Sequence, residues 1–287
     1  GGNYSYTANG ERHGNDLHLA YSTACQHIAD AGFGQTYLVP FRAADWPAST
    51  EQPDTGLAAT PGLPFGSAAL TPELLQQVRD SAELAGLDIH AVLVPSSGID
   101  SNDPIRRYKR VIDQAVALGV SYLIDFGLHG DDSFDDYVAM MRAVAPYAEE
   151  RGVAISMKLH SDGDADKILD NLVAIYDAVD HPAFGLCMDP GNIIFYSAPR
   201  ETDKRYRLPT EGLAEAAHCF NSMIIKDCVI GPTPGEAAHP ARSSNPKGTP
   251  DVMVQPGEGL VDFERVLSVL RQNAGFAGPL CLEKVPG

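Results

Sequence analysis

The chain has 287 residues, of which 44 % are hydrophobic and 21 % are charged, a composition typical of a globular protein with a sizeable core. Its net charge of −17 argues against a nucleic-acid partner, because no basic surplus exists to replace the counterions of the phosphates. No apolar run reaches about 18 residues, so we expect no membrane span.

Short apolar runs alternate with amphipathic segments along the chain, which predicts strands and helices in turn. The predicted helices cover residues 16–31, 71–85, 103–118, 132–150, 164–179, 208–220 and 261–273. The predicted strands cover residues 36–40, 89–94, 122–126, 153–160, 184–189, 222–228 and 279–285, after a weak candidate around Tyr4 and Tyr6. Two stretches rich in Pro and Gly, 41–70 and 230–259, are predicted as long loops.

This alternation predicts parallel βαβ units. Eight strand candidates without a dividing linker favour one domain over residues 1–287, an α/β fold of the (β/α)₈ TIM-barrel type that lacks the eighth helix. A partner subunit would then cover the first and last strands, which leaves a homo-oligomer open, or the sequence is short at its C-terminus.

The five cysteines are odd in number and show no CxxC spacing, so we expect buried free thiols rather than disulfides. The sequence begins Gly-Gly without Met, which fits an expression remnant or a removed leader. We expect a cytoplasmic protein.

The stretch AFGLCMDPGN, residues 183–192, is the most informative one. Its apolar run ends at Asp189, directly before a Pro-Gly break, and a strand that ends in this way places its acid at the edge of a sheet. In a (β/α)₈ barrel the carboxyl ends of the strands hold the chemistry. The alternative is that Asp-Pro-Gly-Asn is simply a turn.

Neighbouring strands end in a similar way. Because strand side chains alternate between two faces, Lys158 is predicted to point into the barrel, and alternate strands place Asp189 and Glu283 in one layer at its mouth. Cys187 and Cys281 fall together in the layer below, and Lys226 is interleaved with the carboxylates.

Two carboxylates and two ammonium groups would thus converge at one place. Such a cluster costs several kcal/mol per ion to desolvate unless the ions are paired, so it is rarely accidental. Burial and proximity would shift the pKa values of the lysines, as proton transfer requires. An ion-pair network that only fixes the register of the strands is the alternative.

At these residues the sequence resembles the xylose isomerase-like TIM-barrel family of sugar phosphate isomerases and epimerases. The motifs are YAEERGVAISMKLH, FGLCMDPGNI, MIIKD, PGEGLVDFERVLSVL and GFAGPLCLEK, in this order. The resemblance implies a divalent metal held by Glu, Asp, His and Glu from four successive strands, with the two glutamates moving a proton beside the substrate carbonyl.

By position, Asp189 and Glu283 match this pattern, whereas Lys158 replaces the first glutamate and Ile224 replaces the histidine. One hypothesis is that the Lys158 ammonium takes the place of the ion and supports a developing enolate. The other is that a divalent metal (Mn, Zn or Mg) persists with His160, Asp189 and Glu283 as ligands. The cofactor is therefore either a divalent metal or none.

Five further residues are candidates for substrate binding. Asn192 follows the Asp189 turn, Trp46 lies in the first long loop, and His129 follows the strand at 122–126. Arg200 and Arg205 belong to a basic group in an otherwise acidic chain, and arginine suits carboxylate or phosphate; ion pairs with nearby acidic helices are the alternative.

The leading interpretation is an isomerase or epimerase that abstracts a proton next to a sugar carbonyl. Glu283 would be the base, Lys158 or a metal would stabilise the enolate, and Lys226 and His160 would bind substrate or relay protons. The alternatives are a keto-sugar lyase and a non-catalytic sugar-binding protein or accessory subunit. The expected partner in each case is a small sugar or sugar derivative.

Overall fold

The computed structural model describes residues 25–38, 66, 70–94, 102–128, 133–159, 167–197, 206–229 and 252–283 of the chain. The chain divides into two compact units. The first consists of Gly1–Asp125 and Met140–Ile155, and the second of Phe126–Ala139 and Ser156–Gly287.

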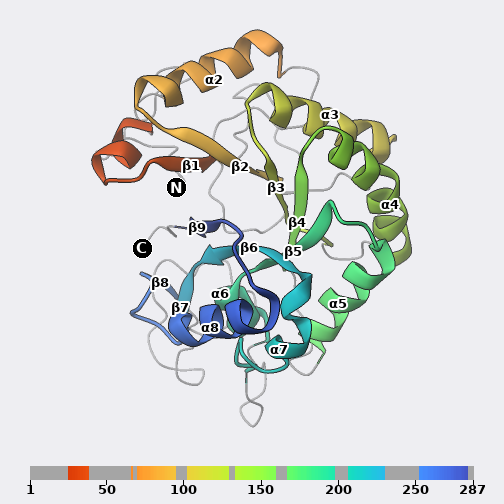
Figure 1. Ribbon diagram of the computed structural model, residues 1–287, viewed down its shortest axis with the longest axis vertical. Helices are drawn as coiled ribbons and strands as arrows, with labels where there is room; N and C mark the ends of the chain where they lie inside the picture. Colours follow the sequence, from red (N-terminus) through yellow and green to blue (C-terminus); the bar gives the residue numbers. More distant parts are fainter. Residues whose placement is uncertain are drawn as a thin grey trace, which may run out of the picture. The chain divides into compact units, whose positions relative to one another are not determined.

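The first unit is a parallel sheet with helices packed against it. Its elements are β1 (Gln35–Leu38), α2 (Pro72–Leu84), β2 (Asp88–Val94), α3 (Pro104–Ala117), β3 (Tyr122–Asp125), most of α4 (Phe134–Glu150) and the first residues of β4 (Ala154–Lys158). The strand order is β1-β2-β3-β4, and β2 pairs in parallel with both β1 and β3. Helix α2 contacts both β2 and α3 (Figure 1).

The helices of this unit begin where the sequence predicts. Thr71 caps α2 by accepting a hydrogen bond from Leu74 N–H at 3.4 Å, and Asp103 caps α3 by accepting one from Arg106 N–H at 3.0 Å. Both helices have Pro at the first position, where the missing N–H costs nothing.

The second unit continues the same alternation. Its elements are the end of β4, α5 (Ile168–Val179), β5 (Phe184–Met188), α6 (Pro190–Ser197), α7 (Leu213–Ala216), a 3₁₀ turn (Ala217–Cys219), β6 (Phe220–Ile225), β7 (Asp227–Val229), β8 (Val252–Val254), α8 (Phe263–Ala274) and β9 (Leu280–Leu282). The strand order is β4-β5-β6-β9, with β6 parallel to both β5 and β9. Strands β7 and β8 form a separate antiparallel pair (Figure 1).

The strands and helices from 71 to 189 and the last helix and strand match the predicted order, although several end one to four residues earlier or later. The weak first strand, most of the helix at 16–31 and most of both long loops lie outside the described residues. Among the described residues no helix is long and apolar enough to cross a bilayer.

Three predicted boundaries are wrong. Residues 190–192, predicted as a break after the strand, are the start of α6, because Asp189 caps this helix and Pro190 suits its first position. The predicted helix at 208–220 is helical only from Leu213 to Cys219. The predicted strand at 222–228 breaks at Lys226, where the backbone leaves the parallel sheet and pairs with β8 instead.

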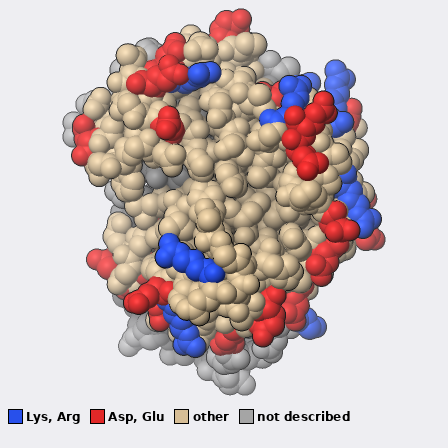
Figure 2. Space-filling model, viewed as in Figure 1, with Lys and Arg blue, Asp and Glu red and all other residues tan. Residues whose placement is uncertain are grey.

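The interior is apolar, and the described surface carries charges of both signs. All five cysteines are buried and free, as predicted. On the face drawn in Figure 2, acidic and basic side chains lie next to one another. Exposed pairs of this kind, such as Arg79 with Glu83 and Arg151 with Asp113, contribute little to stability because solvent screens them.

Candidate functional site

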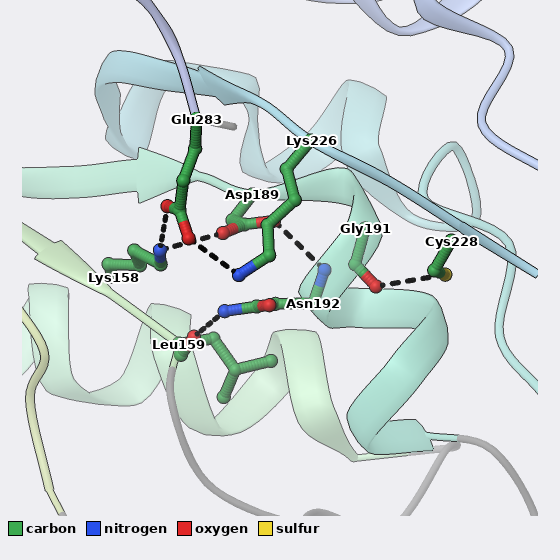
Figure 3. Close-up of polar contacts among 8 residues, drawn as sticks. All are labelled: Lys158, Leu159, Asp189, Gly191, Asn192, Lys226, Cys228 and Glu283. Atoms are coloured by element: carbon green, nitrogen blue, oxygen red, sulfur yellow. Dashed lines mark hydrogen bonds and ion pairs between the residues drawn. The ribbon is translucent and has the colours of Figure 1, made fainter. Parts of the chain in front are cut away.

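Four charged side chains of the second unit converge at the carboxyl ends of its parallel strands (Figure 3). Lys158 is the last residue of β4, Asp189 follows β5, Lys226 follows β6 and Glu283 follows β9. We call these four residues the charge cluster. Their convergence follows from the parallel pairing, because strands that run the same way end at the same edge.

The contacts within the charge cluster are short. Lys158 Nζ lies 2.7 Å from Glu283 Oε2, to which it donates a hydrogen bond, and 3.0 Å from Asp189 Oδ2. Lys226 Nζ donates to the other Glu283 oxygen, Oε1, at 2.8 Å. Positive and negative groups therefore alternate from Lys226 through Glu283 and Lys158 to Asp189 (Figure 3).

Burial separates the four members of the charge cluster into an inner and an outer pair. The side chains of Lys158 and Asp189 are 0 % exposed, whereas those of Lys226 and Glu283 are 8 % and 15 % exposed. Lys158 Nζ also lies 5.0 Å from the centre of the Phe126 ring, an added stabilisation of the buried cation. A ligand that approaches the charge cluster therefore meets Lys226 and Glu283 before Lys158.

The pairing governs the acidities of two members. Burial alone would lower the pKa of Lys158, but the nearby carboxylates of Glu283 and Asp189 outweigh it and raise this pKa above the ordinary 10.5. Burial alone would raise the pKa of Glu283, but the two ammonium groups outweigh it and hold this pKa well below the ordinary 4.5. Lys158 is thus a fixed cation and Glu283 is a weak base. A lysine that transfers protons needs a lowered pKa, and the pKa of Lys158 is shifted in the opposite direction.

Helix α6 holds Asn192 beside the charge cluster. Asn192 N–H donates to Asp189 Oδ1 at 2.9 Å, and its side-chain Nδ2 donates to the carbonyl of Leu159 at 2.7 Å (Figure 3). Asn192 Oδ1 and Asp189 Oδ2 are buried and accept no hydrogen bond from the described residues. Asp189 Oδ2 faces the Lys158 ammonium at 3.0 Å, so Asn192 Oδ1 is the one of the two that is left for a hydroxyl group of a ligand.

Two thiols, Cys187 and Cys281, lie close enough to Lys158 to sense its charge. Burial raises the pKa of the Cys281 thiol to about 11 and raises that of Cys187 further. Both thiols stay protonated at neutral pH, so they supply no nucleophile.

The sequence-predicted site residues are only partly described. The structure brings together Lys158, Lys226, Glu283, Asp189 and Asn192. The other candidates, His160, Trp46, Arg200, Arg205 and His129, lie outside the described residues and stay predictions.

Sequence reasoning missed two features of the site. One is that Asp189 caps α6, for which Asp directly before Pro was a usable signal. The other is Phe126 beneath the buried ammonium, for which the sequence offers no signal, because its position depends on packing between distant segments.

The described residues of this site do not fit a divalent cation. They contain no group of three His, Cys, Asp or Glu side chains that could hold an ion. The Lys158 ammonium lies between both carboxylates and, together with that of Lys226, neutralises them. The fully buried Ile224 supplies no ligand where a histidine was expected. Because His160 lies outside the described residues, a shell of Asp189, Glu283 and His160 stays a prediction.

Chemically, the charge cluster and Asn192 offer a substrate one slightly exposed ammonium, one free acceptor and a carboxylate of low basicity. Such a site suits a polyhydroxylated ligand that develops negative charge on an oxygen atom.

Comparison with known proteins gives one family and several similar folds. The family model described as xylose isomerase-like TIM barrel matches residues 55–286. The 3-oxo-isoapionate decarboxylase of Pectobacterium atrosepticum is 27 % identical over 208 residues, which are 71 % of this chain and 64 % of that protein. The match thus spans less than two thirds of that relative's length.

Two solved structures show the same fold. One is a xylose isomerase-like TIM-barrel protein from Mycobacterium smegmatis in complex with magnesium, with a TM-score of 0.69, 18 % identity and coverage of 99 % of this chain and 87 % of that one. The other is D-allulose 3-epimerase from Methylomonas sp. in complex with D-allulose, with a TM-score of 0.59, 16 % identity and coverage of 98 % and 82 %. They confirm the predicted TIM-barrel fold.

Proposed function

Because the chain belongs to the xylose isomerase-like TIM barrel family, we propose that it is an enzyme that forms an enolate on a sugar-like keto substrate at the charge cluster. The observation that carries this proposal is the pairing of Glu283 with two ammonium groups. The Nζ atoms of Lys158 and Lys226 lie 2.7 and 2.8 Å from its two carboxylate oxygens. This pairing supports a reaction in which positive charge stabilises the product of bond cleavage and in which a strong base is not needed.

Among such reactions, the decarboxylation of a 3-oxo sugar acid suits the site best. The bond between the carboxylate carbon and the α carbon breaks, its electron pair passes to the ketone as an enolate, and carbon dioxide leaves. Water then supplies the proton that the α carbon takes up. Proton abstraction would instead need a basic carboxylate, and the pKa of Glu283 is held too low for that role. The decarboxylase among the relatives supports the same choice.

Each member of the site then has a defined part. Lys226, with Glu283 as its partner and with some exposure, donates to the developing enolate oxygen. Lys158 stays behind it as a fixed cation that holds both carboxylates in place. Asn192 Oδ1 accepts a hydrogen bond from a substrate hydroxyl, which favours a polyol over a simple keto acid.

Carbon dioxide release tests the proposal. The wild-type protein is incubated with 3-oxo-isoapionate and with other 3-oxo sugar acids, and the gas is followed by mass spectrometry against the spontaneous rate. We expect turnover with at least one of them, and a loss of about 10²- to 10³-fold in kcat for Lys226→Met, the range for removal of one oxyanion donor. A rate equal to the uncatalysed one for every acid would refute decarboxylation.

Epimerisation or isomerisation is the second candidate, because the D-allulose 3-epimerase has the same fold. Incubation with ketoses in D₂O distinguishes it, since proton abstraction incorporates deuterium next to the carbonyl without release of carbon dioxide. Saturable binding of a sugar acid without either reaction would point to a sugar-binding protein.

A further inference from the structure

Asp227 is a fully buried carboxylate next to the charge cluster, and it accepts four backbone hydrogen bonds. Its Oδ1 accepts from the N–H groups of Cys228 and Val261 at 2.8 and 3.0 Å. Its Oδ2 accepts from those of Gly257 and Gly259, each at 2.9 Å. We call this arrangement the Asp227 clasp. The bonds from Gly257, Gly259 and Val261 join Asp227 to a segment that lies about thirty residues further along the sequence. Hydrogen bonds to an ionised acceptor are about twice as strong as neutral ones, so this connection is a firm one.

The clasp requires glycine at two positions. A Cβ atom on Gly259 would collide with the Asp227 carboxylate, so a larger residue there would push the carboxylate away. Gly257 has a φ of +93°, which side chains rarely adopt. Next to the clasp, Leu260 N–H donates to the Cys228 carbonyl at 2.9 Å, and β7 pairs with β8 from Asp227 to Val229. The backbone after Lys226 is therefore fixed from several directions.

The backbone of Lys226 is also held from its other side. A Cβ atom on Gly191 would lie 2.7 Å from the Lys226 carbonyl oxygen, so α6 approaches this residue closely because Gly191 has no side chain. The Cys228 thiol donates to the Gly191 carbonyl at 3.4 Å, which ties the same two segments together (Figure 3).

From this geometry we propose that Asp227 is a positioning residue for Lys226. The clasp fixes the break between β6 and β7, and the break sets where the Lys226 ammonium stands, 2.8 Å from Glu283. The clasp thereby acts on the reaction through Lys226, without contact to the substrate. This role rests on the proposed function only in one respect, which is that Lys226 donates to the enolate oxygen.

The test measures the reactivity of the Lys226 amine in Asp227→Asn. An amide in this place offers one acceptor oxygen and turns an NH₂ group toward N–H donors, so the clasp opens. Purified wild type and variant are treated with a trace of acetic anhydride, and acetylation of Lys226 and Lys158 is quantified by mass spectrometry. Amide hydrogen exchange of residues 257–261 is measured on the same samples.

We expect Lys226 in the variant to react about tenfold faster or more, since one hydrogen bond to a charged group is worth about a decade. Lys158 should react at the wild-type rate, and the amides of 257–261 should exchange faster. Asp262→Asn is the matched control, because it removes the same charge in the same segment while asparagine still caps α8. This control should change neither the amines nor these amides.

Equal acceleration of Lys226 and Lys158 would mean general loosening and would overturn the proposal, as would faster amide exchange with Lys226 unchanged. Should Asp227→Asn not fold, Gly257→Ala strains one donor of the clasp and should accelerate Lys226 in the same selective way; without that acceleration the proposal fails. Acetylation needs no substrate, so its result stands whether or not decarboxylation is found. Where turnover is found, the variant should lose kcat with KM little changed.

Discussion

Replacement of Lys158 by methionine removes the cation that lies between two carboxylates. Glu283 keeps Lys226 at 2.8 Å, so Asp189 is the carboxylate left without its cation, in a side chain that is 0 % exposed. Breaking a buried pair in this way costs about 3–5 kcal/mol. Because a domain of ordinary stability has about 5–15 kcal/mol in total, Lys158→Met should retain its fold but lose a large part of its free energy of unfolding.

The pH dependence of this loss has a defined sign. In the wild type the folded pKa of Glu283 lies below 4.5, so its contribution is complete above pH 4.5 and is lost as the pH falls toward the folded value. The folded pKa of Lys158 lies above 10.5, so its contribution is complete below pH 10.5 and is lost as the pH rises through the folded value. Lys158 and Glu283 therefore contribute a constant amount between these limits.

In Lys158→Met the carboxylate without a cation binds a proton in the folded state at a pH where the unfolded chain is still ionised. The variant should therefore recover stability as the pH falls from 7 to 5, by up to about 1.4 kcal/mol per pH unit. Urea unfolding at pH 7, 6 and 5, followed by circular dichroism, measures both the loss and its pH dependence.

Two variants complete this experiment. Lys226→Met leaves Glu283 paired with Lys158 and should cost less, about 1.5–3 kcal/mol for one hydrogen bond to a charged group. Adding Asp189→Asn to Lys158→Met removes the uncompensated charge, keeps the cap of α6 and should restore most of the stability. A Lys158→Met protein within about 1 kcal/mol of wild type, with no pH dependence, would show that Asp189 does not need the Lys158 cation.

Three further predictions concern other contacts. Lys158→Glu restores the glutamate of the family pattern and should bind Mn²⁺ more tightly than wild type, measured by electron paramagnetic resonance of the free ion. Tyr108→Phe removes the hydroxyl that donates to Asp125 at 3.0 Å and should cost about 1–3 kcal/mol in urea unfolding, without effect on the charge cluster. Gly191→Ala pushes against the Lys226 carbonyl and should lower kcat about tenfold or more, since misplacement by about 1 Å can cost a hundredfold.

Controls and contrary results for these variants are direct. Gly34→Ala meets no atom within 4 Å and should leave activity unchanged. Unaltered Mn²⁺ affinity in Lys158→Glu would show that the lysine does not stand in for an ion. Full stability of Tyr108→Phe would show that the hydrogen bond from Tyr108 to Asp125 does not stabilise the fold. Full activity of Gly191→Ala would show that the close approach of α6 to the Lys226 carbonyl does not matter for the reaction.

The parallel strands could be predicted because each is a short apolar run between turn residues, and a polar residue at its end marks the edge of the sheet. Lys158, Asp189 and Glu283 were placed in this way, from alternation within single strands. The direction of the shift in the Lys158 pKa could not be predicted, because it depends on whether the two carboxylates outweigh burial. This balance follows from the distances of 2.7 and 3.0 Å from Lys158 Nζ to Glu283 and Asp189, which belong to distant segments of the chain.

The break at Lys226 was hidden for a similar reason. Residues 222–228, SMIIKDC, are consistent with one continuous strand by sequence, and the antiparallel pairing with β8 depends on residues 252–254, far along the chain. The start of α6, by contrast, is predictable, because Asp189 before Pro190 is a helix-start signal. The Pro-Gly pair was instead interpreted as a break in the chain after the strand.

We propose that the ammonium groups of the charge cluster, and no divalent ion, stabilise the enolate of a 3-oxo sugar acid. The most direct test is carbon dioxide release by protein that has been freed of metal with a chelator and verified by elemental mass spectrometry. We expect an unchanged rate in the chelated wild type and a loss of about 10²-fold or more in Lys226→Met. Activity that disappears with the chelator and returns with added Mn²⁺ or Mg²⁺ would contradict it.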